Sequence, residues 1–544
     1  MKNDRDNTRA WLMSGLFGIL TGTFLAFGYQ LEKLDRIDLS DRNALLVWGM
    51  LMLIITMDTR YIWKGYNLAL EGRKLFGFIR LPVYRDTDAP GKRDFLVNWG
   101  CMILLAIPVF MAEFPGFFVY DAADELNEVL TRTFTTHHPL LHVLLLGGTI
   151  ALFHKLTGSW NVGIFVYLVL QMLVITAIFA YAITYMQKKG IGKKSRILWV
   201  LYYGAFPTIV MYTLCSCKDG LFSALLLLLT VLLLELAQDP EGFTANRKKI
   251  ALFILTATVM PLFRHNGFYA YLVFVPFALI HFRKRLKSLL TPMLIAPVVL
   301  YLVISPVLSA ACHLSEGTHH QEMLTVPIMQ LARVYAYEKD ELTSEDISAI
   351  EAYIPEENLE KYTPRLSDLV KLGFNNDLYE QDSAGFWKVW KKLALEHPMT
   401  YLNAWMLTSY GYVYPPAVIN VYKGNSMYTF TYEESSYFGY EVEVPGERKS
   451  MLKPLDELYR YLSIGTFQSD LPVIHLFFSP GLYVILFMFV LLYRVYRRNY
   501  KGILPFIPMV LTFCTVLLGP TYLVRYVLYL WLTAPLLQVS GRFD

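Results

Sequence analysis

Residues 115–142 read PGFFVYDAADELNEVLTRTFTTHHPLLH, a polar stretch that lies between two long apolar segments. It holds two aspartates, two glutamates, one arginine and three histidines. Ionisable groups are costly in or near a bilayer, so a functional site is the first hypothesis for such a stretch. The architecture depends on which side of the membrane it faces and on which other charged residues share that side.

The composition of the chain is that of a polytopic membrane protein. Of its 544 residues, 55% are hydrophobic and 17% are charged, which is too apolar for an ordinary soluble enzyme. The net charge of +4 is small, which argues against a nucleic-acid partner. Cys215 and Cys217 are too close for an easy disulfide and too few for a zinc site, so we expect all five cysteines to be structural.

The apolar segments predict the fold class, because a transmembrane helix needs about 20 mostly apolar residues. We predict an all-α polytopic membrane protein of about 12 transmembrane helices with an inserted, mostly α-helical extracytoplasmic domain. The predicted spans are residues 11–29, 43–59, 95–112, 161–186, 196–214, 218–238, 249–263, 266–281, 290–311, 472–494, 503–519 and 521–538.

The distribution of lysine and arginine predicts the orientation, since short cytoplasmic loops are enriched in both. With both termini in the cytoplasm, the basic loops all fall inside. Those loops are residues 60–94, 187–196, 247–249, 282–288 and 494–501. For all of these loops to lie inside, residues 139–155 must form a helix at the outer surface, beginning at Pro139, rather than a span. Residues 400–419, which contain Pro-Pro, must likewise lie at the membrane interface.

The predicted organisation therefore has four parts, and the opening stretch faces outward. They are a two-helix extension with its basic cytoplasmic loop (1–94), a membrane core with a first outer loop at 113–160 (95–311), an extracytoplasmic domain (312–470) and the C-terminal transmembrane helices (471–544).

Polar residues from four separate segments gather on the predicted outer side, at or near the ends of spans. This common side makes them candidates for one functional site. They are Asp121, Asp124, Glu125, His137, His138, Lys218, Asp219, Arg264, His265, Asn266, Arg525 and Tyr526.

Each motif also has a purely structural interpretation. The carboxylates of YDAADE can accept a proton from a hydroxyl, or can cap a helix in solvent. His138 and His142, at i and i+4, have a spacing that suits a metal, but the motif lacks the glutamate of H-E-x-x-H. The alternatives are hydrogen bonding to a phosphate or a sugar hydroxyl, and packing at the membrane interface. Lys218, Arg264 and Arg525 suit an anion, and their alternatives are a helix cap, headgroup anchoring and snorkelling.

Carboxylates and cations together suit chemistry on a lipid phosphate. In sugar transfer from a polyprenyl phosphate to a hydroxyl, a carboxylate deprotonates the acceptor, which attacks the anomeric carbon. The leaving phosphate is a weak base, so cations that stabilise its charge suffice and no general acid is needed.

The motifs, in this order, resemble the GT-C superfamily of membrane glycosyltransferases, most of all uncharacterised glycosyltransferase-like proteins of Gram-positive bacteria. The resemblance rests on YDAADE, the HHPLLH surface helix, the span ends KDG, RHNG and VRY, and VPIMQLARVY at 326–335. It covers roughly residues 95–310 and the last spans.

This resemblance implies roles for the candidate residues. Asp121 is the implied catalytic base, with Asp124 or Glu125 as less favoured choices. Lys218, Arg264 and Arg525 would lie near the donor phosphate, and His137 and His138 would line the same cavity. At Asp121 the sequence departs from protein O-mannosyltransferases, because no glutamate follows it directly, and from oligosaccharyltransferases, because it is not part of a D-x-D. No cofactor is therefore expected to be required, and a divalent metal is not favoured.

The expected protein is a glycosyltransferase of the bacterial cytoplasmic membrane. It would transfer a sugar, with inversion, from a polyprenyl-phosphate carrier to an envelope glycan or lipid-linked acceptor on the outer face. A transporter or flippase of lipid-linked glycans would instead place ionisable residues at mid-membrane. A glycan polymerase or ligase would use the same donor chemistry, and a non-catalytic scaffold would leave the outer residues dispersed.

Overall fold

The computed structural model describes residues 2–74, 76–77, 90–285, 288–314, 320–419, 442–464 and 467–539. Every regular element in these ranges is a helix, and two isolated β-bridges are the only strand-like pairings there. The prediction of an all-α protein is confirmed. All five cysteines are free thiols.

Seven helices in the described ranges are long and apolar enough to cross a membrane, so the protein is membrane-embedded. Six of them coincide with predicted spans. These are α1 (Lys2–Leu34), α2 (Arg42–Leu70), α3 (Lys92–Ala112), α6 (Trp160–Lys188), α9 (Lys218–Gln238) and α13 (Leu290–Ala311). The seventh is α5 (Leu140–Thr157), which we expected at the outer surface.

The remaining predicted spans are shorter or interrupted. The span 196–214 is divided into α7 (Lys193–Ala205) and α8 (Pro207–Thr213), because Pro207 cannot continue the helix before it. Four others consist mainly of single helices that are shorter than 18 residues. They are α11 (Arg247–Val259), α12 (His265–His281), α24 (Pro480–Tyr496) and α26 (Ile507–Val516).

The prediction of a last helix over 521–538 is wrong. This segment consists of η7 (Val524–Val527), α27 (Tyr529–Thr533) and η8 (Ala534–Gln538). It is buried in the main core, where a tyrosine from the Pro-Pro segment bonds two of its backbone groups. Tyr412, which is fully buried, donates to the Thr521 carbonyl at 3.0 Å and accepts from the Leu523 amide at 3.0 Å. Irregular backbone is tolerated at membrane depth where protein surrounds it.

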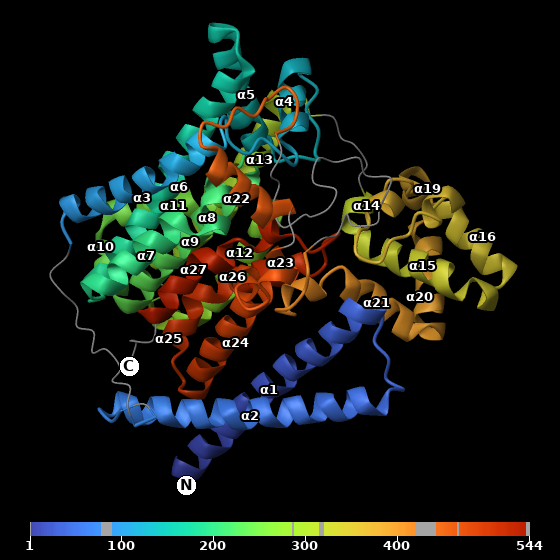
Figure 1. The fold of residues 1–544 in the computed structure, drawn as a ribbon, viewed down its shortest axis with the longest axis horizontal. Coiled ribbons are helices and arrows are strands. Elements are labelled where there is room, and N and C mark those ends of the chain that lie inside the picture. The colour runs from blue at the N-terminus through green and yellow to red at the C-terminus, as the bar shows by residue number, and fades with distance from the viewer. Residues whose placement is uncertain are drawn as a thin grey trace.

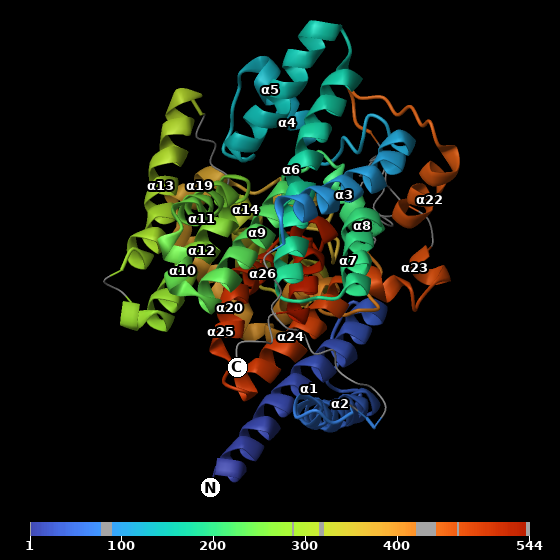
Figure 2. The same cartoon turned by 90° about the vertical axis from the view of Figure 1, so that its left-hand side faces the viewer.

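Helix α9 forms the centre of the main bundle. Its leucines lie on all sides, and 89% of its apolar stretch is buried, against 6% for that of α2. A helix that is apolar all round is stable only when other helices enclose it. α6, α11 and α27 pack against α9, and Figure 2 shows α9 in the middle of the bundle.

Helices α1 and α2 pack against each other along one edge of the bundle (Figure 1). They attach to α24 through aromatic side chains: Trp63 stacks on Tyr496 with 5.9 Å between ring centroids. Asn67 donates from Nδ2 to the Tyr496 hydroxyl at 3.0 Å.

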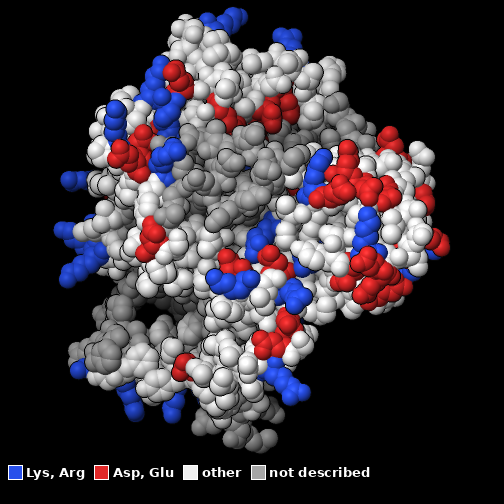
Figure 3. Space-filling view, turned by 45° about the vertical axis from the view of Figure 1, so that its right-hand side comes forward, with Lys and Arg blue, Asp and Glu red and all other residues white. Residues whose placement is uncertain are grey.

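A second, separate hydrophobic core lies beside the bundle (Figure 1). Its main helices are α15 (Thr325–Glu338), α16 (Ser344–Tyr353), α20 (Ser383–Glu396) and α21 (Pro398–Leu407). Acidic side chains are abundant on its surface (Figure 3). The loop between α1 and α2 holds this unit, because Arg365 forms a 2.6 Å ion pair with Asp35.

Candidate functional site

The opening stretch is fixed beside the start of α9 by a short parallel bridge. Phe117 donates from its amide to the Leu214 carbonyl at 3.0 Å, and Ser216 donates back to the Phe117 carbonyl at 2.9 Å. Gly116, at φ +117°, permits this approach, because a Cβ there would lie 2.1 Å from the Leu168 side chain. The parallel register carries Asp121 and Lys218, each a few residues beyond the bridge, to the same place.

Asp121 lies between two cations from distant parts of the chain. Its Oδ2 is 2.7 Å from Nζ of Lys218 and 3.4 Å from Nη1 of Arg525. Burial alone would raise the pKa of Asp121, but the two positive charges outweigh it and hold that pKa well below its usual range. The preceding residue, Tyr120, has φ +66°, a strained conformation for a bulky residue and one that is often found at functional sites. Its ring also receives the Arg525 guanidinium at 4.4 Å.

Glu125 starts a buried chain of hydrogen bonds behind Asp121. On α4 (Ala122–Thr131), it is 1% exposed, bonds to Nδ1 of His142 and lies 3.6 Å from Nζ of Lys218. His142 continues to the Tyr167 hydroxyl at 2.8 Å, which donates to Gln171 at 3.0 Å. Burial would raise the pKa of Glu125, but His142 and Lys218 lower it below its ordinary value. Glu125 is therefore a fixed negative charge that positions Lys218 rather than a base open to substrate.

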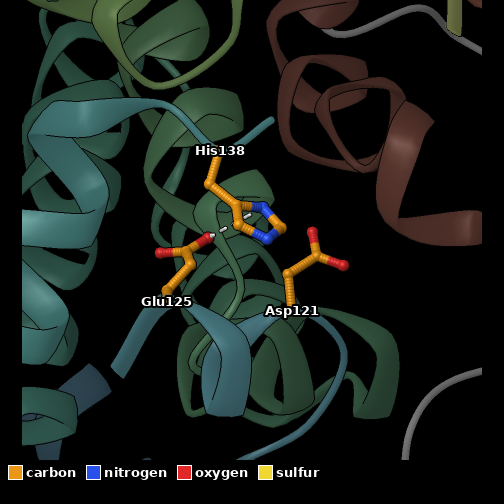
Figure 4. A group of neighbouring side chains, drawn as sticks. All are labelled: Asp121, Glu125 and His138. Atoms are coloured by element: carbon orange, nitrogen blue, oxygen red, sulfur yellow. Dashed lines mark ion pairs between the residues drawn. The ribbon is translucent and has the colours of Figure 1, made fainter. Parts of the chain in front are cut away.

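Asp121, Glu125 and His138 point toward one another from α4 and from the turn before α5 (Figure 4). Their ligand atoms all lie within 4.8 Å of each other, so these three residues could hold a metal ion. Nζ of Lys218 lies among the same atoms, 3.3 Å from Nδ1 of His138. Burial and the Lys218 charge lower the pKa of His138 to about 4, so the ring is neutral and accepts from the ammonium. The lysine thus supplies a positive charge at the position that a metal would take.

A second group of charges extends the site toward α12. Asp219 is fully buried; its Oδ1 bonds to Arg264, and its Oδ2 lies 3.9 Å from Nη1 of Arg525. The Tyr526 ring receives the guanidinium groups of Arg264 and Arg525 at 4.6 and 5.0 Å from its centroid. The aromatic face holds the two arginines side by side, and both reach toward the same buried carboxylate.

The remaining candidates lie at the margins of this cluster or outside it. Asp124 and His137 are exposed, with the His137 ring packed on that of His138. His265 bonds through Nδ1 to the Tyr301 hydroxyl at 2.8 Å, and Asn266 donates to Thr515 at 3.1 Å. His265 and Asn266 thus make hydrogen bonds of their own and take no part in the ion pairs of the charged cluster.

Sequence reasoning missed a carboxyl group that reaches the site from residues 442–451. This segment runs antiparallel to the chain before Asp121: the amide of Glu443 donates to the Phe118 carbonyl at 2.8 Å, and that of Lys449 to the Phe114 carbonyl at 2.8 Å. A buried ion pair between Arg448 and Glu113 clamps the segment down. No sequence signal marked Glu443. Tyr167 and Gln171, also missed, do have one, because they are polar residues within an apolar span.

The cluster is electrically balanced before any ligand arrives. Its three cations are Lys218, Arg264 and Arg525, and its three fixed carboxylates are Asp121, Glu125 and Asp219. An added phosphate would compete with these carboxylates for the cations. The arrangement can therefore bind an anion and, in the same event, release a carboxylate to act on a neighbouring proton.

Residues 111–541 match the model of DUF6020, which is described as a family of unknown function. The chain belongs to this family. No curated protein and no solved structure matches it. The match includes every residue of the charged cluster, whereas α1 and α2 lie outside it.

Proposed function

We propose that this DUF6020 protein is a membrane glycosyltransferase that transfers a sugar from a polyprenyl-phosphate carrier to a hydroxyl of an envelope glycan or lipid-linked acceptor. The site would face the outside of a bacterial cytoplasmic membrane, with both termini in the cytoplasm. The observation that carries the proposal is the position of Asp121, which contacts Lys218 and Arg525 through one oxygen. A proton acceptor and a phosphate site are thus adjacent.

The donor phosphate would bind to Lys218, Arg525 and Arg264, since arginine and lysine are the preferred partners of phosphate. Sharing these cations weakens their hold on Asp121 and raises its basicity toward that needed for proton transfer. Donor binding would therefore activate the base.

The transfer step follows from this geometry. Asp121 accepts the proton of the acceptor hydroxyl, whose oxygen forms a bond to the anomeric carbon. The bond from that carbon to the phosphate oxygen breaks, and its electron pair leaves with the polyprenyl phosphate. The three cations stabilise the developing charge. Attack opposite the leaving group inverts the anomeric configuration.

The direct test is consumption of a panel of radiolabelled polyprenyl-phosphate sugars by the full-length protein in proteoliposomes. The proposal predicts that one or more donors are consumed and that the glycosidic product has the opposite anomeric configuration by NMR. Consumption of no donor, or retention of configuration, would reject the mechanism.

A further inference from the structure

Glu443 reaches the site on a well-fixed segment. Its amide donates to Phe118, and its carboxyl group accepts a hydrogen bond from the backbone amide of Tyr120, directly before Asp121. The segment is held on its other side by Asn161, which bonds the Glu447 amide at 2.9 Å and the Glu447 carbonyl at 2.7 Å. The backbone of this segment is therefore fixed on both sides, and the Tyr120 amide orients the carboxyl group.

The surroundings of Glu443 favour its neutral form. Burial, and after it the charges of Asp121 and Asp124, raise the pKa of Glu443 to about 8. The Tyr120 amide and Arg525 oppose the shift only partly. No described lysine or arginine lies within ion-pair distance of this carboxyl group. At neutral pH it can donate one hydrogen bond and accept another, unlike Asp121.

We infer that Glu443 is the acceptor-positioning residue of the site and that the acceptor is an uncharged glycan with neighbouring hydroxyl groups. The inference rests on the proposed transferase function. One hydroxyl oxygen of the acceptor accepts a hydrogen bond from Glu443, and the adjacent hydroxyl gives its proton to Asp121. Glu443 keeps its own proton throughout, so the atoms and charges of the transfer step are unchanged.

Charge selects this class of acceptor. The side of the cluster near Glu443 is acidic, because the charges of Asp121 and Asp124 both act on the Glu443 carboxyl group. We call it the carboxyl side. A phosphorylated or carboxylated acceptor on the carboxyl side would place like charges close together, which costs several kcal/mol of binding free energy in an interface. Neutral sugar hydroxyls suit that side, because they both donate and accept hydrogen bonds.

The test measures acceptor KM and kcat from pH 6 to 9.5 for wild type, E443Q, E443A and the control E447Q. Glu447 is on the same segment, but its side chain is 75% exposed. We expect E443A to raise the acceptor KM about tenfold, the effect of one lost hydrogen bond. The amide of E443Q should restore much of that loss and abolish the fall in wild-type activity above about pH 8. E447Q should match wild type.

Three results would overturn the inference. E443Q as inactive as E443A would make Glu443 an ionised base. Farnesyl phosphate, a short isoprenoid phosphate, serves as the probe of the donor-phosphate site. If E443A has an unchanged acceptor KM and still binds farnesyl phosphate, Glu443 is not part of the acceptor site, although the transferase proposal stands. A preference for anionic over neutral acceptors would contradict the assigned acceptor class. If wild type neither binds farnesyl phosphate nor transfers sugar, the proposed function fails, and this inference fails with it.

Discussion

Replacing Lys218 with methionine should remove the main contact for the donor phosphate. Nζ of Lys218 is 2.7 Å from Asp121, 3.6 Å from Glu125 and 3.3 Å from His138, and its side chain is 13% exposed. Methionine is unbranched and only one atom shorter than lysine, so it keeps most of the packing along the start of α9. The substitution therefore removes one positive charge from a buried group of acceptors.

The expected loss can be worked out from these contacts. A hydrogen bond to a charged group contributes about 2 kcal/mol, which corresponds to about a 30-fold increase in Kd. The carboxylates left behind would repel the incoming phosphate, so about 30-fold is a lower bound. Arg264 and Arg525 remain, which keeps some binding measurable.

The assay is isothermal titration calorimetry, in which the protein in nanodiscs is titrated with farnesyl phosphate and the Kd is measured. K249M is the matched control, because Lys249 forms an ion pair of the same 2.7 Å length, with Glu235, near the other end of α9. Its Kd should stay within about twofold of wild type, and K218R should lie between wild type and K218M. A K218M protein that unfolds at the same temperature as K249M but binds farnesyl phosphate with wild-type affinity would refute the phosphate site.

Three further predictions follow from other contacts. R448M leaves the fully buried Glu113 without its partner and should cost about 3–5 kcal/mol of unfolding free energy, measured by thermal unfolding. The double variant with E113Q should recover most of this loss, and an R448M protein as stable as wild type would mean that the ion pair is not formed. The pKa of Glu443 in the folded state is raised to about 8, so the unfolded state binds fewer protons above about pH 4.5. The unfolding free energy of wild type should therefore fall relative to that of E443Q from about pH 5 to 8, and an equal dependence on pH in the two proteins would contradict this. Removal of divalent metal with EDTA should leave sugar transfer unchanged, because the Lys218 ammonium takes the place of a metal. A loss of transfer that an added divalent ion restores would show instead that a metal occupies this position.

The charged cluster could be predicted because its residues were expected on the same side of the membrane, and not because of any strong motif. Asp121, Lys218 and Arg525 all stand near the ends of apolar segments, and positive-inside counting places those ends on one side. Their shared side made a common site plausible, and the structure places Lys218 and Arg525 2.7 and 3.4 Å from Asp121 Oδ2. The contact that fixes them, the bridge from Phe117 to Cys215, depends on tertiary register and left no trace in the composition.

The missed features have physical reasons. Hydropathy reports how apolar a segment is but not whether lipid or protein surrounds it, so 521–538 looked like a membrane helix although it is broken and buried. For the same reason it cannot separate a surface helix from a span, and α5 is apolar enough for either. Glu443 lies in a polar segment far along the chain, where one carboxyl group among many carries no signal until folding brings it to Tyr120.

The central claim is most directly tested by sugar transfer from the donor panel in proteoliposomes, comparing wild type with D121N and D124N. Asp124 is the matched control, because it lies one turn along the same segment but is exposed. The account predicts that wild type and D124N transfer sugar and that folded D121N loses nearly all activity while still binding farnesyl phosphate. Transfer that survives in D121N but not in D124N would move the base to Asp124, and the absence of transfer from every donor by wild type would contradict the proposed function.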